Sequence, residues 1–168
     1  MMKHQNKLIA AVAVVAILAG AGASLLRTPD APEARFATLA GETLTTSGLR
    51  GQVVLVNFWA TTCSVCVAEM PRLAELHRRF ESRGFTTIAV AMSYDHPNHV
   101  AAFATQKPQP FRIALDSTGE VAKRFGNVTA TPTTFLIDRR GRIVKQVLGE
   151  PDWPDFTRLV DRLLAEAA

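Results

Sequence analysis

The sequence predicts a mixed α/β sandwich, in which helices cover both faces of a single sheet. Two apolar segments, residues 52–60 and 85–93, flank a stretch of helical periodicity without any short hairpin turn, which is typical of a parallel strand-helix-strand unit. Two later strand-like segments flank residues 139–141, as in an antiparallel hairpin. An amphipathic helix near the C-terminus can cover the sheet. We therefore expect a sheet that is parallel in its first half and antiparallel at one edge.

The strand-helix-strand unit begins with a central strand. Residues 52–60 form an almost continuous apolar run with β-branched and aromatic side chains, which indicates a strand covered on both faces. Residues 63–83 repeat apolar side chains near the helical period, and Gly84 is suited to the C-terminal cap of that helix. After the second strand, we expect a short helix over residues 97–106 and a further strand over residues 111–116.

The second half of the chain supplies two more helices and the hairpin. A helix is expected from Ser117 to Phe125, with Ser117 and Glu120 as a capping box and Gly126 at its end. The last helix follows from apolar residues at i, i+3, i+4, i+7 and i+8, namely Phe156, Leu159, Val160, Leu163 and Leu164.

The N-terminus carries a segment that meets a membrane. Residues 8–26 contain no charged side chain and follow Lys3 and Lys7, and this length is about sufficient to span a bilayer as an uncleaved anchor. The alternative is a cleaved signal, which the small residues Ala21 and Ala23 would suit. We favour the anchor. The positive-inside rule keeps the lysines in the cytoplasm and exports the rest of the chain.

The chain therefore divides into three parts. Residues 1–26 are the membrane anchor or signal segment, residues 27–35 are a Pro- and Ala-rich tether, and residues 36–168 are one domain. The formal net charge is +4, from 19 basic and 15 acidic residues. This excess is too small to indicate a nucleic-acid partner.

Cys63 and Cys66 are the only cysteines in the chain, and three functions compete for them. A structural zinc needs about four ligands. The histidines that could complete such a site lie apart: His77 three turns along the helix, His4 before the apolar segment, and His96 and His99 on a surface turn. A structural disulfide is also disfavoured, because closing so short a loop removes little chain entropy.

The third function, thiol-disulfide exchange, has a physical mechanism. If Cys63 opens the helix after the central strand, free backbone N–H groups and the helix dipole stabilise its thiolate, so we expect the pKa of its thiol to fall below that of a free cysteine. Cys66 lies one turn later on the same helix face, deeper and less accessible. This arrangement makes Cys63 the nucleophile.

Two stretches carry a resemblance to a known family. "VNFWATTCSVCVAEMP" and "TATPTTFLIDRRGRIV" resemble the thioredoxin superfamily, and specifically its exported, often membrane-anchored TlpA/ResA-like branch. The resemblance covers residues 36–168. It implies a thioredoxin-like fold with an added N-terminal hairpin and a central strand-helix insertion at about residues 95–118.

The resemblance also implies site residues. Cys63 matches the attacking cysteine and Cys66 the resolving one. Pro132 matches the cis-proline that faces the cysteines, although X-Pro bonds in general are cis only about one time in twenty. A cis bond there would leave the backbone of Thr131 free to pair with an extended substrate segment. Trp59 resembles the active-site tryptophan, which would contact substrate, although a buried aromatic residue on a central strand would explain it equally well.

Glu69 is the expected acid-base group. Thioredoxin keeps a buried aspartate six residues before its first cysteine, but this chain has Asn57 there, and an amide cannot take a proton. Glu69 shares a helix face with Cys66, and TlpA/ResA-like proteins have a glutamate at this position. It could accept the proton of Cys66. The alternative is a solvated acid near a helix N-terminus.

The resemblance implies a thiol:disulfide oxidoreductase that works without a metal or other cofactor. The main hypothesis is a reductase of specific protein disulfides, for example in cytochrome c or copper-site maturation, which receives electrons from a membrane thiol reductant. It would lie on the periplasmic side of a bacterial inner membrane, or be soluble in the periplasm if the signal is cleaved. Thr62 and Val65 depart from the common family pattern, which leaves the redox potential and the partner open.

Two other functions use the same fold. A copper-delivery module spaces its cysteines one residue further apart and adds a histidine ligand. A peroxiredoxin places a proline seven residues and a threonine three residues before its reactive cysteine, where this chain has Val56 and Ala60. The sequence therefore favours disulfide exchange over both.

Overall fold

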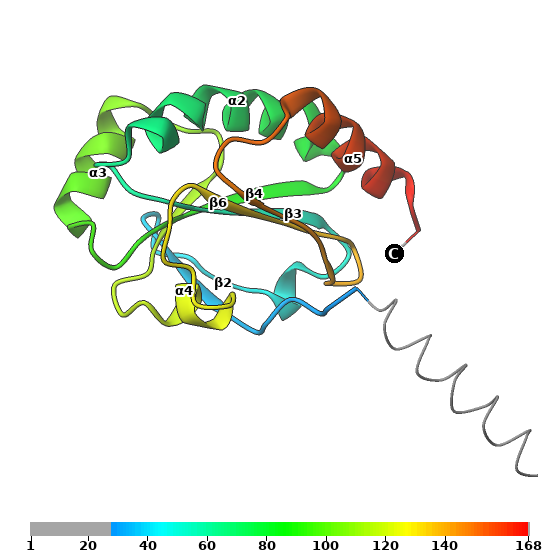
Figure 1. The fold of residues 1–168 in the computed structure, drawn as a ribbon, viewed down its shortest axis with the longest axis horizontal. Coiled ribbons are helices and arrows are strands. Elements are labelled where there is room, and N and C mark those ends of the chain that lie inside the picture. Colours follow the sequence, from blue (N-terminus) through cyan, green and yellow to red (C-terminus); the bar gives the residue numbers. More distant parts are fainter. Residues whose placement is uncertain (1–27, 168) are drawn as a thin grey trace, which may run out of the picture.

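Strand β3 (Val53–Trp59) lies inside a seven-stranded sheet with the order β2-β1-β5-β4-β3-β6-β7. The computed structural model describes residues 28–167, and helices cover both faces of the sheet (Figure 1). The other elements are β1 (Arg35–Thr38), β2 (Thr43–Thr45), η1 (Ser47–Leu49), α2 (Ser64–Phe80), η2 (Glu81–Arg83), β4 (Phe85–Ala91), α3 (Pro97–Gln106), β5 (Arg112–Leu115), α4 (Glu120–Arg124), β6 (Thr133–Ile137), β7 (Ile143–Leu148) and α5 (Trp153–Ala165).

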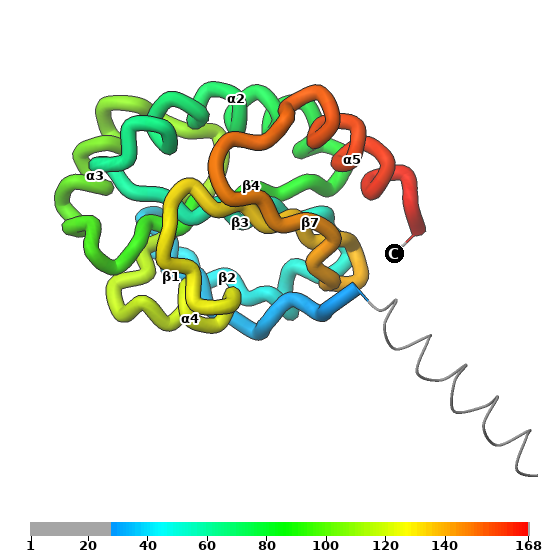
Figure 2. The backbone as a smooth tube through the Cα atoms, in the orientation of Figure 1, coloured from blue at the N-terminus to red at the C-terminus, as the bar shows by residue number. Residues whose placement is uncertain are grey.

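The side chains of β3 alternate between two cores. Val53, Leu55 and Trp59 belong to a cluster with α2, α3 and α5, and Val54 and Phe58 belong to a second cluster with α4. Every residue of β3 is buried, as a strand covered on both faces requires. Figure 2 shows the resulting layers, with α2, α3 and α5 on one side of the sheet and α4 on the other. The predicted α/β sandwich is confirmed.

The pairing of the strands confirms the parallel unit and extends the antiparallel part. β4 pairs in parallel with both β3 and β5. Antiparallel pairing was expected at one edge but occurs on both sides: β6 and β7 on one, and the N-terminal hairpin β1-β2 on the other. The inserted segment contributes α3 and then β5, which lies between β1 and β4 and so joins the hairpin to the central strands.

Helix α2 begins directly after the loop that follows β3. Cys63 is its N-cap residue, with extended backbone angles, and Ser64 is its first helical residue. The helix is followed by the short helix η2, which ends at Gly84 with a φ of 87°. This left-handed angle favours glycine, so the predicted cap at Gly84 is confirmed.

The predicted capping box of the fourth helix is wrong. Helix α4 starts at Glu120 and has Gly119 at its N-cap, which has no side chain to offer. The cap comes instead from Asp116, whose carboxylate oxygens accept hydrogen bonds from the N–H groups of Val121 at 3.1 Å and Ala122 at 2.8 Å. Asp116 directly follows β5 and is buried, whereas Ser117 is exposed.

The predicted membrane segment, residues 8–26, lies outside the described residues. Within residues 28–167, no helix combines the length and the apolar character needed to cross a bilayer.

Candidate active site

Cys63 and Cys66 form a disulfide at the start of α2. Cys63 is partly exposed, and its sulfur accepts a hydrogen bond from the backbone N–H of Cys66 at 3.2 Å. Cys66 is completely buried. The predicted asymmetry between an accessible sulfur at the helix start and a deeper sulfur one turn later is therefore present.

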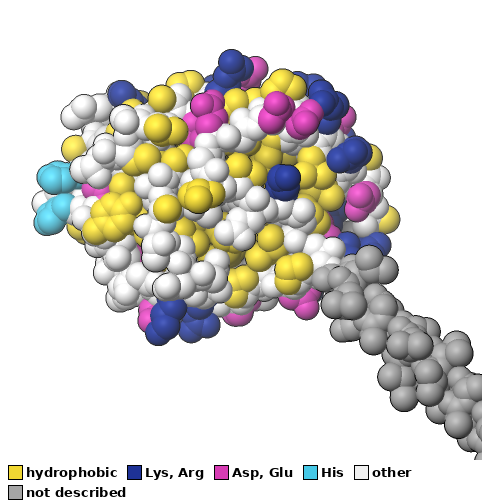
Figure 3. Space-filling view, in the orientation of Figure 1, with side chains coloured by type: hydrophobic (Ala, Val, Ile, Leu, Met, Phe, Trp, Pro, Cys, Tyr) yellow, Lys and Arg dark blue, Asp and Glu magenta, His cyan; other side chains and the backbone are white. Residues whose placement is uncertain are grey.

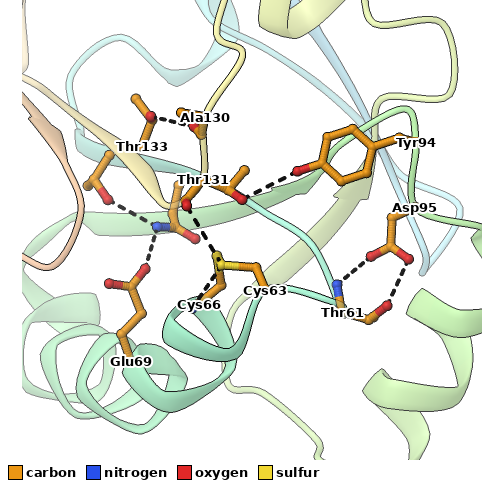
Figure 4. The surroundings of a disulfide bond; sticks show 11 residues. Thr61, Cys63, Cys66, Glu69, Tyr94, Asp95, Ala130, Thr131 and Thr133 are labelled. Atoms are coloured by element: carbon orange, nitrogen blue, oxygen red, sulfur yellow. Dashed lines mark hydrogen bonds between the residues drawn. A yellow bond between two sulfur atoms is a disulfide. The ribbon is translucent and has the colours of Figure 1, made fainter.

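A loop before β6 faces the accessible sulfur. The Thr131-Pro132 peptide bond is cis, as the resemblance implied. The carbonyl oxygen of Thr131 lies 3.7 Å from the sulfur of Cys63, and Thr131 itself is half-buried. Figure 4 shows Thr131 beside the disulfide and Glu69 on the opposite side of it. Segments almost seventy residues apart in the sequence thus meet at the sulfurs.

Glu69 lies about one helical turn after Cys66 on α2 and is only 2% exposed. Its Oε1 accepts a hydrogen bond from the amide Nδ2 of Asn57 at 2.9 Å, and the same Nδ2 donates to the hydroxyl of Thr134 at 3.0 Å. Asn57 can reach both because it shares the α2-facing side of β3 with Leu55 and Trp59 and pairs directly with Thr134 on β6. Glu69 is therefore held in the interior, and the alternative of a solvated acid is wrong.

Burial makes Glu69 an unusual acid. It raises the pKa of Glu69 from 4.5 to about 7, the hydrogen bond from Asn57 opposes this rise, and the negative charge of Glu150 adds to it. The second carboxyl oxygen, Oε2, has no hydrogen-bond partner among the described residues. A group with a pKa near neutrality can both take up and release a proton at physiological pH.

Asn57 has a role that the sequence interpretation missed. The sequence identified it only as a position where the proton acceptor of thioredoxin is absent. The structure shows instead an amide donor that orients Glu69. The alternation of β3 indicates that Asn57 faces α2, but it does not identify Glu69 as its partner.

A third loop, between β4 and α3, also reaches the site. Asp95 is 6% exposed, and its carboxylate accepts hydrogen bonds from the backbone N–H of Thr61 at 2.5 Å and from its hydroxyl at 2.8 Å. The hydroxyl of Tyr94 lies 3.3 Å from that of Thr131. Neither residue was predicted. The signal was topological, because β3 and β4 are parallel and their C-terminal loops must emerge at the same edge of the sheet.

Trp59 requires a correction. It is completely buried and packs on Phe103 of α3, with ring centroids 4.9 Å apart. The side chain therefore offers no surface to a protein substrate. Its position supports the second interpretation from the sequence, a buried aromatic residue on a central strand, rather than direct substrate contact.

The histidines of the described segment do not gather around the cysteines. His77 is buried between Phe85 and Phe111, and this burial lowers its pKa. His96 and His99 are exposed at the start of α3. Among residues 28–167, no three side chains of His, Cys, Asp or Glu come together as a metal site would require. That the protein works without a metal or other cofactor stays a prediction.

Comparison with known proteins identifies the family. Residues 28–163 match the sequence pattern of the family described as Redoxin. The chain belongs to the redoxin family. This redoxin is 31% identical over 158 residues to the thiol-disulfide oxidoreductase ResA of Bacillus cereus, and the match covers 87% of this chain and 90% of the relative. It is 34% identical over 119 residues to ResA of Geobacillus thermodenitrificans, covering 71% and 67% of the two chains.

Solved structures agree with this assignment. The fold of this redoxin matches a thiol:disulfide interchange protein of the thioredoxin family from Chlorobium tepidum with a TM-score of 0.74 and 28% identity, over 82% of this chain and 97% of the other. The TlpA/ResA-like resemblance and the thioredoxin-like fold are therefore confirmed. With its Cys-x-x-Cys pair at Cys63 and Cys66, this redoxin is a thiol:disulfide oxidoreductase that acts on protein thiols.

Proposed function

We propose that this redoxin is an exported reductase of specific protein disulfides, in which Cys63 attacks and Cys66 resolves. The observation that carries the proposal is the difference between the two sulfurs: Cys63 is partly exposed at a helix start, whereas Cys66 is buried next to a carboxyl group with a pKa near neutrality. In such a dithiol the substrate reacts first with the exposed Cys63, and the buried Cys66, with its neighbouring carboxyl group, completes the exchange.

The proposed reaction has two displacement steps. The thiolate of Cys63 attacks one sulfur of the substrate disulfide, which breaks that S–S bond and releases the other substrate sulfur as a thiolate. Glu69 then takes the proton of Cys66, whose thiolate attacks Cys63 and releases the second substrate sulfur. Two electrons pass to the substrate, and the protein is left with the Cys63-Cys66 disulfide.

The substrate would bind beside the cis-proline loop. Among the described residues, neither the N–H nor the C=O of Thr131 has a backbone hydrogen-bond partner. An extended substrate segment could pair with these groups as an added strand, next to Pro132 and the attacking sulfur. This is the role that we propose for Thr131 and Pro132.

Export and the direction of electron flow belong to the proposal as well. The apolar segment of residues 8–26 supports export with the domain held at the periplasmic face of the inner membrane. In an oxidising compartment a reductase needs an electron source, so we propose a membrane thiol reductant as the donor. Candidate substrates are proteins whose cysteines must be reduced before they bind haem or copper.

The test is a trapping experiment with Cys66→Ser in the full chain. This variant can attack but lacks the thiol that resolves the mixed disulfide, so the substrate stays attached. Purification from membranes and periplasm without reductant is expected to give covalent adducts that dithiothreitol releases, and mass spectrometry identifies them. Cys63→Ser is the matched control, and we expect far fewer adducts because its remaining thiol is buried.

The same preparation tests the location. We expect the adducts in carbonate-washed membranes, attached to chains that still contain Lys3 and Lys7. Soluble chains that begin near Ser24 would show that the apolar segment is a cleaved signal and not an anchor. Equal trapping by the two variants would contradict the assigned roles, and a folded Cys66→Ser variant that traps no protein would contradict the proposed function.

A further inference from the structure

The two segments that form the surface around the disulfide contain no charged residue. Residues 60–67, which include both cysteines, and residues 126–137, which include the cis-proline, contain no Asp, Glu, Lys or Arg. Figure 3 shows charged side chains mainly along the upper edge, the right side and the lower rim of this face, whereas its centre is mostly uncharged. A substrate segment that pairs with these two segments meets no charged side chain on them, so apolar contacts contribute to its recognition.

Three exposed apolar side chains border this surface. Val65, between the cysteines, is 48% exposed, Tyr94 is 59% exposed and Leu148 is 69% exposed. Tyr94 contacts Thr131, and Leu148 pairs with Thr133, the residue after the cis-proline. Exposed large apolar side chains that gather around one site are typical of an interaction surface.

Tyr94 differs from the other two because its side chain is held by a contact of its hydroxyl. Its hydroxyl lies 3.3 Å from that of Thr131. The next residue, Asp95, is buried and binds Thr61 through two hydrogen bonds, and the N–H of Asp95 donates to the carbonyl of Met92 at 2.9 Å. The loop is thus tied to both segments that flank the disulfide, as Figure 4 shows. Its aromatic ring is exposed but already positioned, which lowers the entropy lost when a partner packs against it.

We infer that Tyr94 is a specificity-determining residue: its ring packs against an apolar side chain next to the cysteine of an extended protein substrate. The inference rests on the proposed function, because exchange brings the substrate sulfur to Cys63 and therefore brings the flanking substrate residues against the Thr131 loop and the ring bound to it. Asp95 acts as a positioning residue that holds this ring in place. An aromatic side chain that becomes buried when a partner binds is a common source of selectivity.

Two synthetic peptides test the inference. Each contains one cysteine joined by a disulfide to thionitrobenzoate, flanked in one peptide by Val and Phe and in the other by Ser and Gly. The Cys63 thiolate attacks the peptide sulfur and thionitrobenzoate leaves, after which Cys66 releases the peptide thiol. The measured quantity is the ratio of the second-order rate constant of thionitrobenzoate release from the apolar peptide to that from the polar peptide, in a single turnover of the full-length reduced protein in detergent.

We expect the wild-type ratio to favour the apolar peptide and Tyr94→Ala to lower it about fivefold to tenfold, chiefly through slower reaction with the apolar peptide. Tyr94→Phe keeps the ring and is expected to keep most of the ratio. Leu39→Ala is the matched control, since Leu39 is also an exposed apolar residue (37%) but follows β1, which β5 and β4 separate from β3.

Asp95 supplies a second, independent comparison. Asp95→Ala removes both bonds to Thr61 and is expected to lower the ratio as Tyr94→Ala does. Asp95→Asn can accept the N–H of Thr61 and donate to its hydroxyl, so it is expected to restore the ratio. A ratio that Tyr94→Ala leaves unchanged, or rates for both peptides that fall equally, would overturn the inference. A wild-type protein that reduces neither peptide would contradict the proposed function itself, and the inference with it.

Discussion

At the scale of single residues, Glu69 shows how burial and hydrogen bonding set a proton affinity. The carboxyl group is almost completely buried but keeps one hydrogen bond from Asn57. Burial raises its pKa to about 7, because the charged form loses more hydration than the amide restores. The result is a carboxyl group, one helical turn from Cys66, that can take up and release a proton near neutral pH, as the proposed exchange requires.

The raised pKa has a measurable cost in stability. Below pH 4.5 Glu69 is protonated in the folded and the unfolded protein, whereas between pH 4.5 and about 7 the folded state binds the extra proton. The free energy of unfolding therefore falls as pH rises through this window. For the oxidised protein, we expect Glu69→Gln to gain on the order of 2–3 kcal/mol relative to the wild type between pH 4.5 and pH 8, measured by urea unfolding.

An exposed acid on the same helix is the control. Glu75 has a side chain that is 72% exposed, so Glu75→Gln is expected to show no such change with pH. The functional readout is the rate at which the mixed disulfide resolves, which Glu69→Gln is expected to slow near neutral pH without loss of the fold. If the stability difference between Glu69→Gln and the wild type does not change with pH, Glu69 does not have the buried environment described here.

At the scale of elements, α4 shows that a helix cap can depend on tertiary structure rather than on the local sequence. The sequence indicated a cap from Ser117, but the two hydrogen bonds come from Asp116, which is buried at the end of the preceding strand segment. We expect Asp116→Ala to destabilise the protein by about 1–2 kcal/mol, because it leaves two N–H groups without a partner. Ser117→Ala is expected to change stability by less than about 0.5 kcal/mol. Chemical denaturation of both variants measures the difference, and the opposite ranking would restore the capping box.

At the scale of the whole molecule, the fold gathers three loops at one edge of the sheet. The loops after β3 and β4 meet there because the two strands are parallel, and the loop before β6 joins them because β6 runs antiparallel to β3. These loops carry Cys63, Tyr94 and Thr131, respectively. The site is therefore a consequence of strand direction as much as of local sequence.

The sequence was sufficient for the features that depend on local pattern. The buried strand β3, the helix that starts at the cysteines and the difference between Cys63 and Cys66 all follow from spacing and periodicity. The bonds of Asn57 to Glu69 and of Asp95 to Thr61 could not be derived in this way, because each joins segments whose approach depends on how the sheet is assembled. The burial of Trp59 is similar, since it depends on α3 covering that end of β3.

The account depends most on the claim that the fold exposes one thiol and buries the other. Reduction of the full chain followed by brief iodoacetamide treatment over a range of pH, with fragment-ion mass spectrometry, measures which sulfur is modified. We expect Cys63 to be modified first, with a pH midpoint below the value of about 8.5 for a free cysteine, and Cys66 to react only after unfolding. Modification of Cys66 before Cys63 in the folded protein would contradict the account.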